Sequence, residues 1–200
     1  MLYLDNCALV GRGLHRECYA HPMNSDLCVK VVVAGNSDEN RREAAYYQRL
    51  SRRGISWEML TRFHGLVETS LGEGAVFDLV RDSDGSVSKT LASYLECDAL
   101  TSPHRQVLVQ AMQNLKEYLL LNRVVTMTLK PKNILLQLNP AGDGKLVIVD
   151  NVANSDFIPI TNYSARLARR KIERKWRRFD NSLRCQYVHN SALVEVLGLD

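Results

Sequence analysis

Residues 126–136 begin as a short loop and end in an apolar, strand-like run, Ile134-Leu135-Leu136. This order restricts the fold more than any other stretch. Before the loop, apolar residues at helical spacing predict a long helix that ends near Asn122. The loop itself contains the string Leu-Lys-Pro-Lys-Asn at 129–133. After it, two strands are expected at 133–138 and 145–149, joined by a turn that contains proline and glycine. We therefore expect a helix, a polar loop and a β-hairpin in succession.

Two oxygen-bearing side chains on this hairpin are candidate metal ligands. Asn133 begins the first strand, and Asp150 follows the last apolar residue of the second strand, seventeen residues later. Mg²⁺ is usually held by one or two protein carboxylates, while phosphate and water supply the other ligands. The pair Asp150-Asn151 is equally typical of a turn in which the aspartate side chain accepts a backbone hydrogen bond.

The first third of the chain alternates between apolar and polar residues and is rich in Val, Tyr, Leu and Cys. This pattern predicts short strands, and one longer segment has helical periodicity with Ser37 or Asp38 as its N-cap. The expected order is three strands at 7–10, 17–20 and 27–33, a helix at 38–52, and two strands at 62–68 and 74–80.

The remainder is expected to be mostly helical. Residues 82–86 are polar and include a glycine, so we expect a flexible linker there. A helix is predicted at 88–96, and Ser102 and Pro103 are expected as the N-cap and first residue of the long helix. Its buried face would hold Val107, Leu108, Ala111, Met112, Leu115, Tyr118 and Leu119, and two further helices are expected at about 163–179 and 190–197.

Three features of the first third suggest phosphate binding. Gly11 and Gly13 lie between two predicted strands, where glycine allows positive φ and a close approach of the backbone to phosphate. An ordinary hairpin turn would also use them. Lys30 lies within an apolar strand, and a buried ammonium requires a carboxylate or a phosphate. Glu43 on the following helix is a candidate partner, although Lys30 on an edge could instead extend to solvent.

Composition excludes several classes of protein. The five cysteines are scattered without a CxxC pair, which argues against a disulfide framework or a structural zinc site and fits a reducing cytosol. The first residues lack a basic segment followed by an apolar run, so no signal peptide is expected. No apolar run reaches the roughly 18 residues of a transmembrane helix. A cytoplasmic location is the resulting expectation.

Taken together, these features resemble a protein kinase over about residues 5–155. The strings GRGLHRECYAHP and TMTLKPKNILL, with Asp-Asn in place of Asp-Phe, more closely resemble bacterial YrbL-type proteins, which are named for the PhoP regulatory network. The resemblance implies an α+β, protein-kinase-like bilobal fold. A five-stranded antiparallel N-lobe with one helix would occupy residues 1–81, and a reduced, mostly helical C-lobe would occupy residues 82–200.

The same resemblance implies an ATP site in which Mg²⁺ is the metal. Gly11 and Gly13 would cover the phosphates. Lys30 would bind the phosphates and pair with Glu43.

The remaining roles that the resemblance implies fall on later residues. Residues 77–80, with Phe77 and Leu79, would form the hinge that contacts adenine. Lys130 would reach the γ-phosphate, and Asn133 and Asp150 would hold Mg²⁺.

The sequence departs from the kinase pattern at the position of the catalytic base. The pattern has aspartate where Thr128 stands. A threonine hydroxyl does not accept a proton at neutral pH, but it can orient an acceptor. General-base catalysis contributes about 10²–10⁴ in rate, so slow transfer is expected. Asp156 is an alternative base.

Two further departures concern the segment after the hairpin. The string Asp-Asn-Val at 150–152 keeps the metal ligand but lacks the phenylalanine and glycine of the kinase pattern, which argues against a regulated flip of this segment. Only about 50 residues follow Asp150, too few for a full kinase C-lobe. A small or atypical acceptor is therefore favoured over a general protein substrate.

Positive charge is concentrated at residues 166–178, which contain eight basic residues and one acidic residue, Glu173. The net charge of the whole chain is +4, so the remainder is acidic. The segment is a basic amphipathic helix whose apolar stripe is expected to pack on the C-lobe. Its charges are candidates for binding an acidic protein, nucleic-acid phosphates or an anionic membrane surface. The stripe comprises Ala165, Ala168, Ile172, Trp176 and Phe179.

The leading hypothesis is an ATP- and Mg²⁺-binding kinase-like protein with weak or atypical phosphotransferase activity on an unknown acceptor. One alternative is a non-catalytic pseudokinase that acts as a regulatory binding module. A second is a nucleic-acid-associated protein that binds through residues 166–178. A third is transfer of AMP from ATP.

Overall fold

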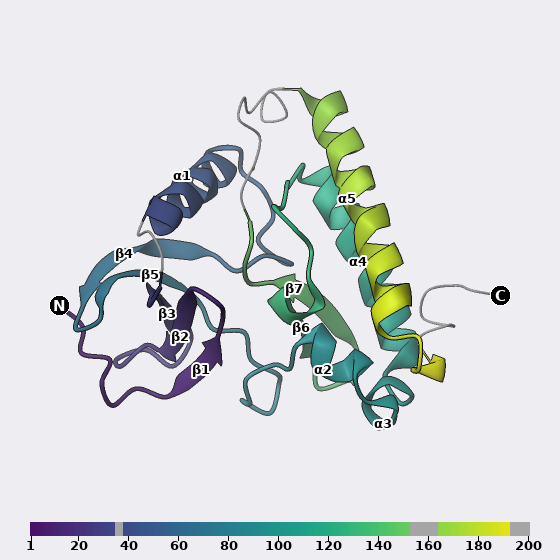
Figure 1. The fold of residues 1–200 in the computed structure, drawn as a ribbon, viewed down its shortest axis with the longest axis horizontal. Coiled ribbons are helices and arrows are strands. Elements are labelled where there is room, and N and C mark those ends of the chain that lie inside the picture. Colours follow the sequence, from purple (N-terminus) through teal and green to yellow (C-terminus); the bar gives the residue numbers. More distant parts are fainter. Residues whose placement is uncertain (35–37, 153–163, 193–200) are drawn as a thin grey trace. The chain divides into compact units, whose positions relative to one another are not determined.

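The computed structural model describes residues 1–34, 38–152 and 164–192, and the chain divides into two compact units (Figure 1). The first unit contains Met1–Trp57 and Thr61–Arg81, and the second contains Glu58–Leu60 and Asp82–Asp200. The described residues form a mixed α and β structure, as the sequence predicted.

The first unit is built on a five-stranded antiparallel sheet with the order β1-β2-β3-β5-β4. The predicted strand count and antiparallel pairing are confirmed. Helix α1 contacts β4 and β5. The elements are β1 (Leu9–Arg12), β2 (Arg16–Ala20), β3 (Leu27–Val32), α1 (Asp38–Arg52), β4 (Phe63–Thr69) and β5 (Gly72–Asp78).

One face of this sheet is covered by the N-terminal segment. Val29 and Val31 of β3 alternate with residues of the opposite face and join Val76 and Leu4 in a buried cluster. The segment is fixed in place because the Leu2 N–H donates to the Glu68 carbonyl at 2.8 Å. The alternation therefore produces one apolar face, and the N-terminal segment covers this face in place of a helix.

The other face carries aromatic side chains that pack against α1. Tyr47 of α1 is 1% exposed and meets the Phe77 ring edge-on, with 5.3 Å between the ring centroids. Phe63 lies 5.4 Å from Phe77, and Trp57 stacks on Tyr47 at 6.0 Å. Such pairs add about 0.5–1.5 kcal/mol each beyond their buried area. This cluster anchors α1 on the sheet.

The second unit combines helices with a two-stranded hairpin, β6–β7. Helix α4 contacts both β7 and α5. Its predicted buried face is confirmed, except that Val107 is half-buried. The elements are α2 (Leu91–Leu95), α3 (Asp98–Thr101), α4 (Arg105–Leu121), the 3₁₀ turn η1 (Pro131–Asn133), β6 (Ile134–Leu138), β7 (Gly144–Ile148) and α5 (Ala165–Gln186).

Residues 82–86, the predicted linker between the lobes, lie directly after the boundary of the first unit at Arg81 and form a hydrogen-bonded turn. The Asp82 N–H donates to the Ser86 carbonyl at 2.9 Å. The Asp82 carboxylate accepts hydrogen bonds from the Ser88 hydroxyl at 2.6 Å and the Leu138 N–H at 2.9 Å. The side chain of Asp82 thus attaches this turn to the hairpin.

Other differences concern helix boundaries. Ser102 is the C-cap of α3 instead of the N-cap of α4, whose N-cap is His104. Helix α5 begins after its N-cap Ser164 and continues to Gln186, beyond the predicted end at 179. Of the helix expected at 190–197, only the first residues are described, and Ser37 also lies outside the described residues.

No helix among the described residues is long and apolar enough to cross a lipid bilayer.

Candidate functional site

Lys30 occupies the centre of the sheet in the first unit and is buried, at 7% exposure. In the strand register it lies opposite Cys18 of β2 and Ala75 of β5, which are both small. Its ammonium lies over the Phe77 ring, 4.1 Å from the centroid. A cation over an aromatic face gains electrostatic energy that partly offsets its desolvation. The predicted buried strand lysine is confirmed.

Glu43 projects from α1 and is also buried, at 5% exposure. Its Oε2 forms an ion pair with Arg16 Nη1 at 2.5 Å. Its Oε1 is buried and has no hydrogen-bond partner among the described residues. A buried carboxylate oxygen without a donor is costly, and it marks a place where a further cation or donor would be favourable.

Arg16 is a residue that the sequence interpretation missed, because only the glycines of this segment, Gly11 and Gly13, were considered as site residues. Strand alternation could have found it. Arg16 and Cys18 are two residues apart on β2, so they share a face, and Cys18 pairs with Lys30.

Of the two predicted glycines, Gly11 lies within β1, opposite Cys18 of β2, and Gly13 lies in the turn between these strands. The Gly13 N–H donates to the Arg16 carbonyl at 2.7 Å and closes the turn. Neither Gly11 nor Gly13 has positive φ, so the conformational reason given for them is wrong. A Cβ built on Gly11 would meet no other atom within 4 Å. The space above this residue is open to a ligand.

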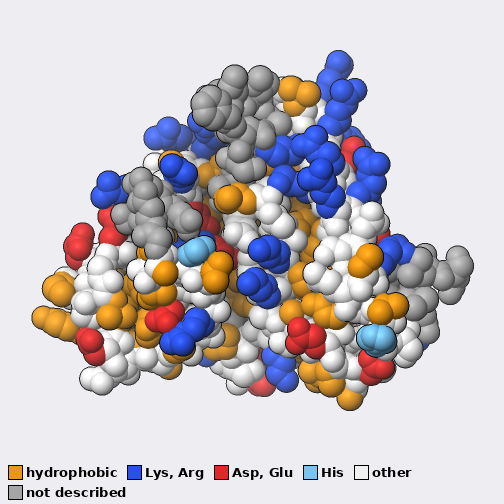
Figure 2. Space-filling view, in the orientation of Figure 1, with side chains coloured by type: hydrophobic (Ala, Val, Ile, Leu, Met, Phe, Trp, Pro, Cys, Tyr) orange, Lys and Arg blue, Asp and Glu red, His pale blue; other side chains and the backbone are white. Residues whose placement is uncertain are grey.

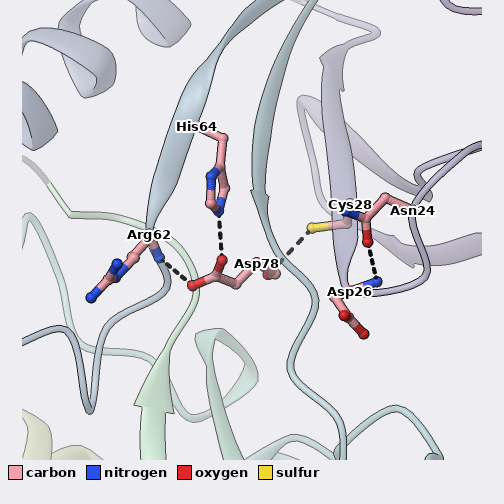
Figure 3. A network of polar contacts seen from close by, with 6 residues as sticks. All are labelled: Asn24, Asp26, Cys28, Arg62, His64 and Asp78. Atoms are coloured by element: carbon pink, nitrogen blue, oxygen red, sulfur yellow. Dashed lines mark hydrogen bonds and ion pairs between the residues drawn. The ribbon is translucent and has the colours of Figure 1, made fainter.

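The end of β5 is fixed by a polar network around Asp78 (Figure 3). Asp78 Oδ1 lies 2.6 Å from His64 Nε2, and Oδ2 accepts a hydrogen bond from the Arg62 N–H at 2.9 Å. The Asp78 carbonyl accepts a hydrogen bond from the Cys28 thiol at 3.6 Å. These contacts hold Asp78, the last residue of β5, which lies within the predicted hinge of residues 77–80.

The predicted hinge residues Phe77 and Leu79 are both buried. The Leu79 N–H donates to the Asp26 carbonyl at 2.7 Å. Asp26 belongs to a turn in which its own N–H donates to Asn24 Oδ1 at 2.9 Å (Figure 3). The amide of Leu79 is thus already engaged, and contact with adenine would have to use other groups of this segment.

Cys28, on the same sheet face as Lys30, is predicted to resist alkylation. A hydrogen bond with the Cys18 side chain and burial both raise the pKa of the Cys28 thiol. Less thiolate is then present at any given pH, and the thiolate is the nucleophile. At pH 8 we expect iodoacetamide to label the exposed Cys185 well before Cys28, as measured by peptide mass spectrometry.

The control for this labelling is the chain in urea, where all five cysteines should react at similar rates. Equal labelling of Cys28 and Cys185 in the folded protein would contradict the prediction.

In the second unit, the segment 126–130 is held at Met127. The Met127 N–H donates to the Asn151 carbonyl at 2.8 Å. The Met127 carbonyl accepts a hydrogen bond from Lys175 Nζ of α5. Thr128 and Lys130 are exposed. Thr128, at the position of a catalytic base, is therefore accessible to a ligand. The preceding residue, Met127, is held through both its N–H and its carbonyl.

Asn133 and Asp150 lie at the same end of the β6–β7 hairpin. Ile134 pairs with Ile148, and the Val149 N–H donates to the Asn133 carbonyl at 3.0 Å. The Asn133 side chain is half-buried and makes no hydrogen bond to the described part of the chain. The hairpin therefore places both predicted metal ligands at one end.

The backbone after Asp150 turns sharply. Asp150 Oδ1 accepts a hydrogen bond from the N–H of Asn151, at 2.8 Å. Asn151 has φ 61°, a conformation that asparagine tolerates better than most residues.

In residues 1–34, 38–152 and 164–192, no three His, Cys, Asp or Glu side chains form a metal-binding group. One carboxylate and one amide suit Mg²⁺, which takes few protein ligands. Asp156, the alternative base, lies outside the described residues.

The apolar stripe of α5 packs as expected. Ala168, Ile172, Trp176 and Phe179 are buried, whereas Ala165 is exposed. The stripe continues to Leu183, because the helix is longer than predicted.

Lys and Arg side chains gather over α5 (Figure 2). Arg169 pairs with Glu173, with 3.1 Å between Nε and Oε1. Lys171 is buried. The exposed basic residues of this helix are Arg166, Arg169, Arg170, Arg174, Arg177 and Arg178.

A pocket of about 530 Å³ connects this helix with the predicted loop. Thr128 and Lys130 line one side, and Lys175 and Arg178 of α5 line the other. No part of the sequence pattern indicated that α5 would meet this loop.

Comparison with known proteins was informative over most of the chain. Residues 2–184 match the family model described as PhoP regulatory network protein YrbL. The chain is 41% identical over 182 residues to "Uncharacterized protein YrbL" of Escherichia coli (strain K12), which covers 90% of this chain and 86% of that protein. The protein of the same name from Shigella flexneri gives the same values.

Proposed function

The chain belongs to the family of the PhoP regulatory network protein YrbL, and on this premise we propose that it binds ATP with Mg²⁺ on a protein-kinase-like fold. The proposal includes weak or atypical phosphoryl transfer to an acceptor other than a general protein substrate. The kinase-like assignment rests on the order of chemical groups along the chain: a glycine turn, a strand lysine, a helix glutamate, a polar loop and a strand-final aspartate.

The observation that carries the proposal is the buried Lys30 ammonium. It lies on the same side of the sheet as α1, the helix that carries Glu43, and the Oε1 of that carboxylate has no hydrogen-bond donor among the described residues. Burial of these charges is costly for a purely structural role. Lys30 supplies a positive charge of the kind that a nucleotide phosphate binds. The open space above Gly11 would admit the phosphates to the backbone.

The second unit would supply the metal ligands. Asn133 has a side chain without a partner in the described chain, and Asp150 is half-buried at the same end of the hairpin. When bound, Mg²⁺ neutralises charge on the β- and γ-phosphates. Lys130 is exposed and would add positive charge at the γ-phosphate. Thr128 would orient the acceptor hydroxyl without removing its proton, and for that reason we expect slow transfer.

The test is the thermal stabilisation of the full chain by ATP, with and without Mg²⁺. A ligand present at 100 times its Kd stabilises the folded state by about 2.7 kcal/mol, which is roughly 5–10 °C in Tm for a chain of this size. We expect this shift for the wild type with Mg²⁺, and we expect it to be lost in Lys30→Ala and strongly reduced in Asp150→Ala.

Matched controls separate binding from stability. Asp143→Ala changes an exposed aspartate at the opposite end of the hairpin that carries Asp150, and Lys116→Ala removes an exposed lysine. Both should keep the ATP-dependent shift. The shift of each variant is measured against its own ligand-free Tm, so lower stability alone does not count. The absence of any Mg²⁺-dependent shift in the wild type would reject the proposal.

Labelled ATP then distinguishes the alternatives. Transfer of the γ-label supports a kinase, and transfer of the α-label supports AMP transfer. ATP binding without transfer of either label supports a regulatory pseudokinase.

A further inference from the structure

The pocket of about 530 Å³ lies wholly within the second unit, and its walls are residues 127–132, α5 and part of α2. Ligand pockets for small molecules commonly measure about 300–1,000 Å³. The volume is therefore suited to a small molecule.

The charge of the pocket selects an anion. Its wall contains four basic side chains, Lys130, Lys132, Lys175 and Arg178, and one acidic side chain, Glu96. Lys130, Lys132 and Arg178 have no ion-pair partner in the part of the chain that the structure describes. Cations gathered in a concave wall repel one another, and a bound anion would relieve that repulsion.

The walls are also fixed in position. The hydrogen bond from Lys175 Nζ to the Met127 carbonyl joins α5 to the loop. Phe179 is buried and packs edge-on against Trp176, with 5.6 Å between the ring centroids. Tyr187 also lines the pocket, and a tyrosine hydroxyl can donate a hydrogen bond to an anion. A preformed site of this kind binds its ligand at a low ordering cost.

Arg178 differs in position from most of the basic residues of α5. Arg166, Arg170, Arg174 and Arg177 are exposed but do not line the pocket. A polyanion lying along the helix would use these residues, whereas a small anion in the pocket would not. The convergence of Arg178 with Lys130 and Lys132 favours the small ligand.

We propose that this pocket binds a small molecule that carries a phosphate or carboxylate group, with Lys132 and Arg178 as its principal anion contacts. The neighbouring Thr128 places the ligand at the position of the missing catalytic base.

The ligand is then a candidate for the phosphoryl acceptor, and this role rests on the proposed function. In that step, a hydroxyl oxygen of the ligand bonds to the γ-phosphorus of ATP. The bond from that phosphorus to the β–γ bridging oxygen breaks, ADP leaves with the electron pair, and the hydroxyl proton passes to solvent.

The test is an NMR titration of the ¹⁵N-labelled full chain with inorganic pyrophosphate and, separately, with citrate. The buffer contains EDTA and no nucleotide, and the ionic strength is kept constant. We expect saturable shifts of the amides of residues 127–132 and of α5 from Arg178 onward. A charge-assisted hydrogen bond contributes enough that Lys132→Ala and Arg178→Ala should each weaken the binding about tenfold or more. Preference for one probe identifies the anionic group as phosphate or carboxylate.

Arg170→Ala is the matched control, because it removes an exposed arginine of the same helix that does not line the pocket. It should leave the affinity unchanged. Equal weakening by Arg170→Ala and Arg178→Ala, or shifts that rise linearly without saturation, would overturn the proposal. A fluorescein-labelled single-stranded RNA forms a further arm. If RNA binding depends equally on Arg170 and Arg178, the basic residues act as one surface of α5, and the proposal of a small-anion pocket is rejected.

Failure of this proposal can be distinguished from failure of the proposed function. The titration uses neither ATP nor Mg²⁺, and Lys132→Ala and Arg178→Ala should keep the ATP-dependent thermal shift. If the wild-type chain binds Mg²⁺-ATP but neither anion, only the proposal of an anion-binding pocket is rejected. If the wild-type chain binds the anions but not ATP, the anion-binding pocket is supported and its role in phosphoryl transfer is rejected.

Discussion

With ATP and Mg²⁺ present, the Thr128→Asp variant is expected to release ADP about 10²-fold faster than the wild type, or more. The new carboxylate would accept the proton that threonine cannot. Thr128 is exposed, so the substitution buries no charge, and the fixed Met127 keeps the new side chain in place. The measurement is ADP formation with water as the acceptor, together with mass spectrometry of the chain for attached phosphate.

Thr128→Asn is the control for this substitution, because asparagine has nearly the shape of aspartate but accepts no proton at neutral pH. It should remain near the wild-type rate. Equal acceleration by both variants would show that shape and not basicity is responsible. An unchanged rate in an aspartate variant that still binds ATP would remove Thr128 from the chemistry.

The second large effect concerns the aromatic cluster under α1. Phe77→Ala is expected to lower the free energy of unfolding of the first unit by about 3–5 kcal/mol. The substitution removes ring contacts with Tyr47 and Phe63 and the ring beneath the Lys30 ammonium. A buried cation that loses such a contact adds to the cost of the cavity.

Because the chain divides into two units, global unfolding is a poor measure of this effect. Native-state hydrogen exchange of the β3 and β5 amides reports the first unit directly. Met23→Ala, which truncates a side chain that is 79% exposed, should change the result by no more than about 0.5 kcal/mol. A loss in Phe77→Ala no greater than in Met23→Ala would contradict the account of this cluster.

The elements that were predicted well are those with a complete local signal. Helix α1 spans Asp38–Arg52, as expected, because a polar start and buried Tyr46, Tyr47 and Leu50 follow the helical period. The hairpin β6–β7 lies within one residue of its expected position, because apolar runs flank an obvious turn.

The boundary at Ser102 failed for a physical reason. Serine followed by proline is a strong helix-start signal. Here Thr101 is fully buried and donates its hydroxyl proton to the Tyr94 carbonyl at 2.5 Å. Its side chain also accepts a hydrogen bond from Asn190 Nδ2 at 2.8 Å, 89 residues away. This contact between residues far apart in sequence fixes the end of α3 at a position where the local signals alone predict the start of α4.

Single residues of the candidate site could be predicted from the sequence, but the residues that they contact could not. Lys30 was identified because a lysine in an apolar strand is conspicuous. The ion pair of Glu43 with Arg16, and the approach of Arg178 to the 127–132 segment, depend on tertiary packing. No local pattern encodes which helix face meets which loop.

The double attachment of Met127 has a consequence for the order of folding during synthesis. Its carbonyl is held by Lys175, which lies 48 residues later in the chain. A ribosome therefore completes the loop and the hairpin well before the helix that fixes them has been translated. The loop acquires its final conformation late, and a premature stop before α5 would leave Thr128 without its support even if all earlier elements had formed.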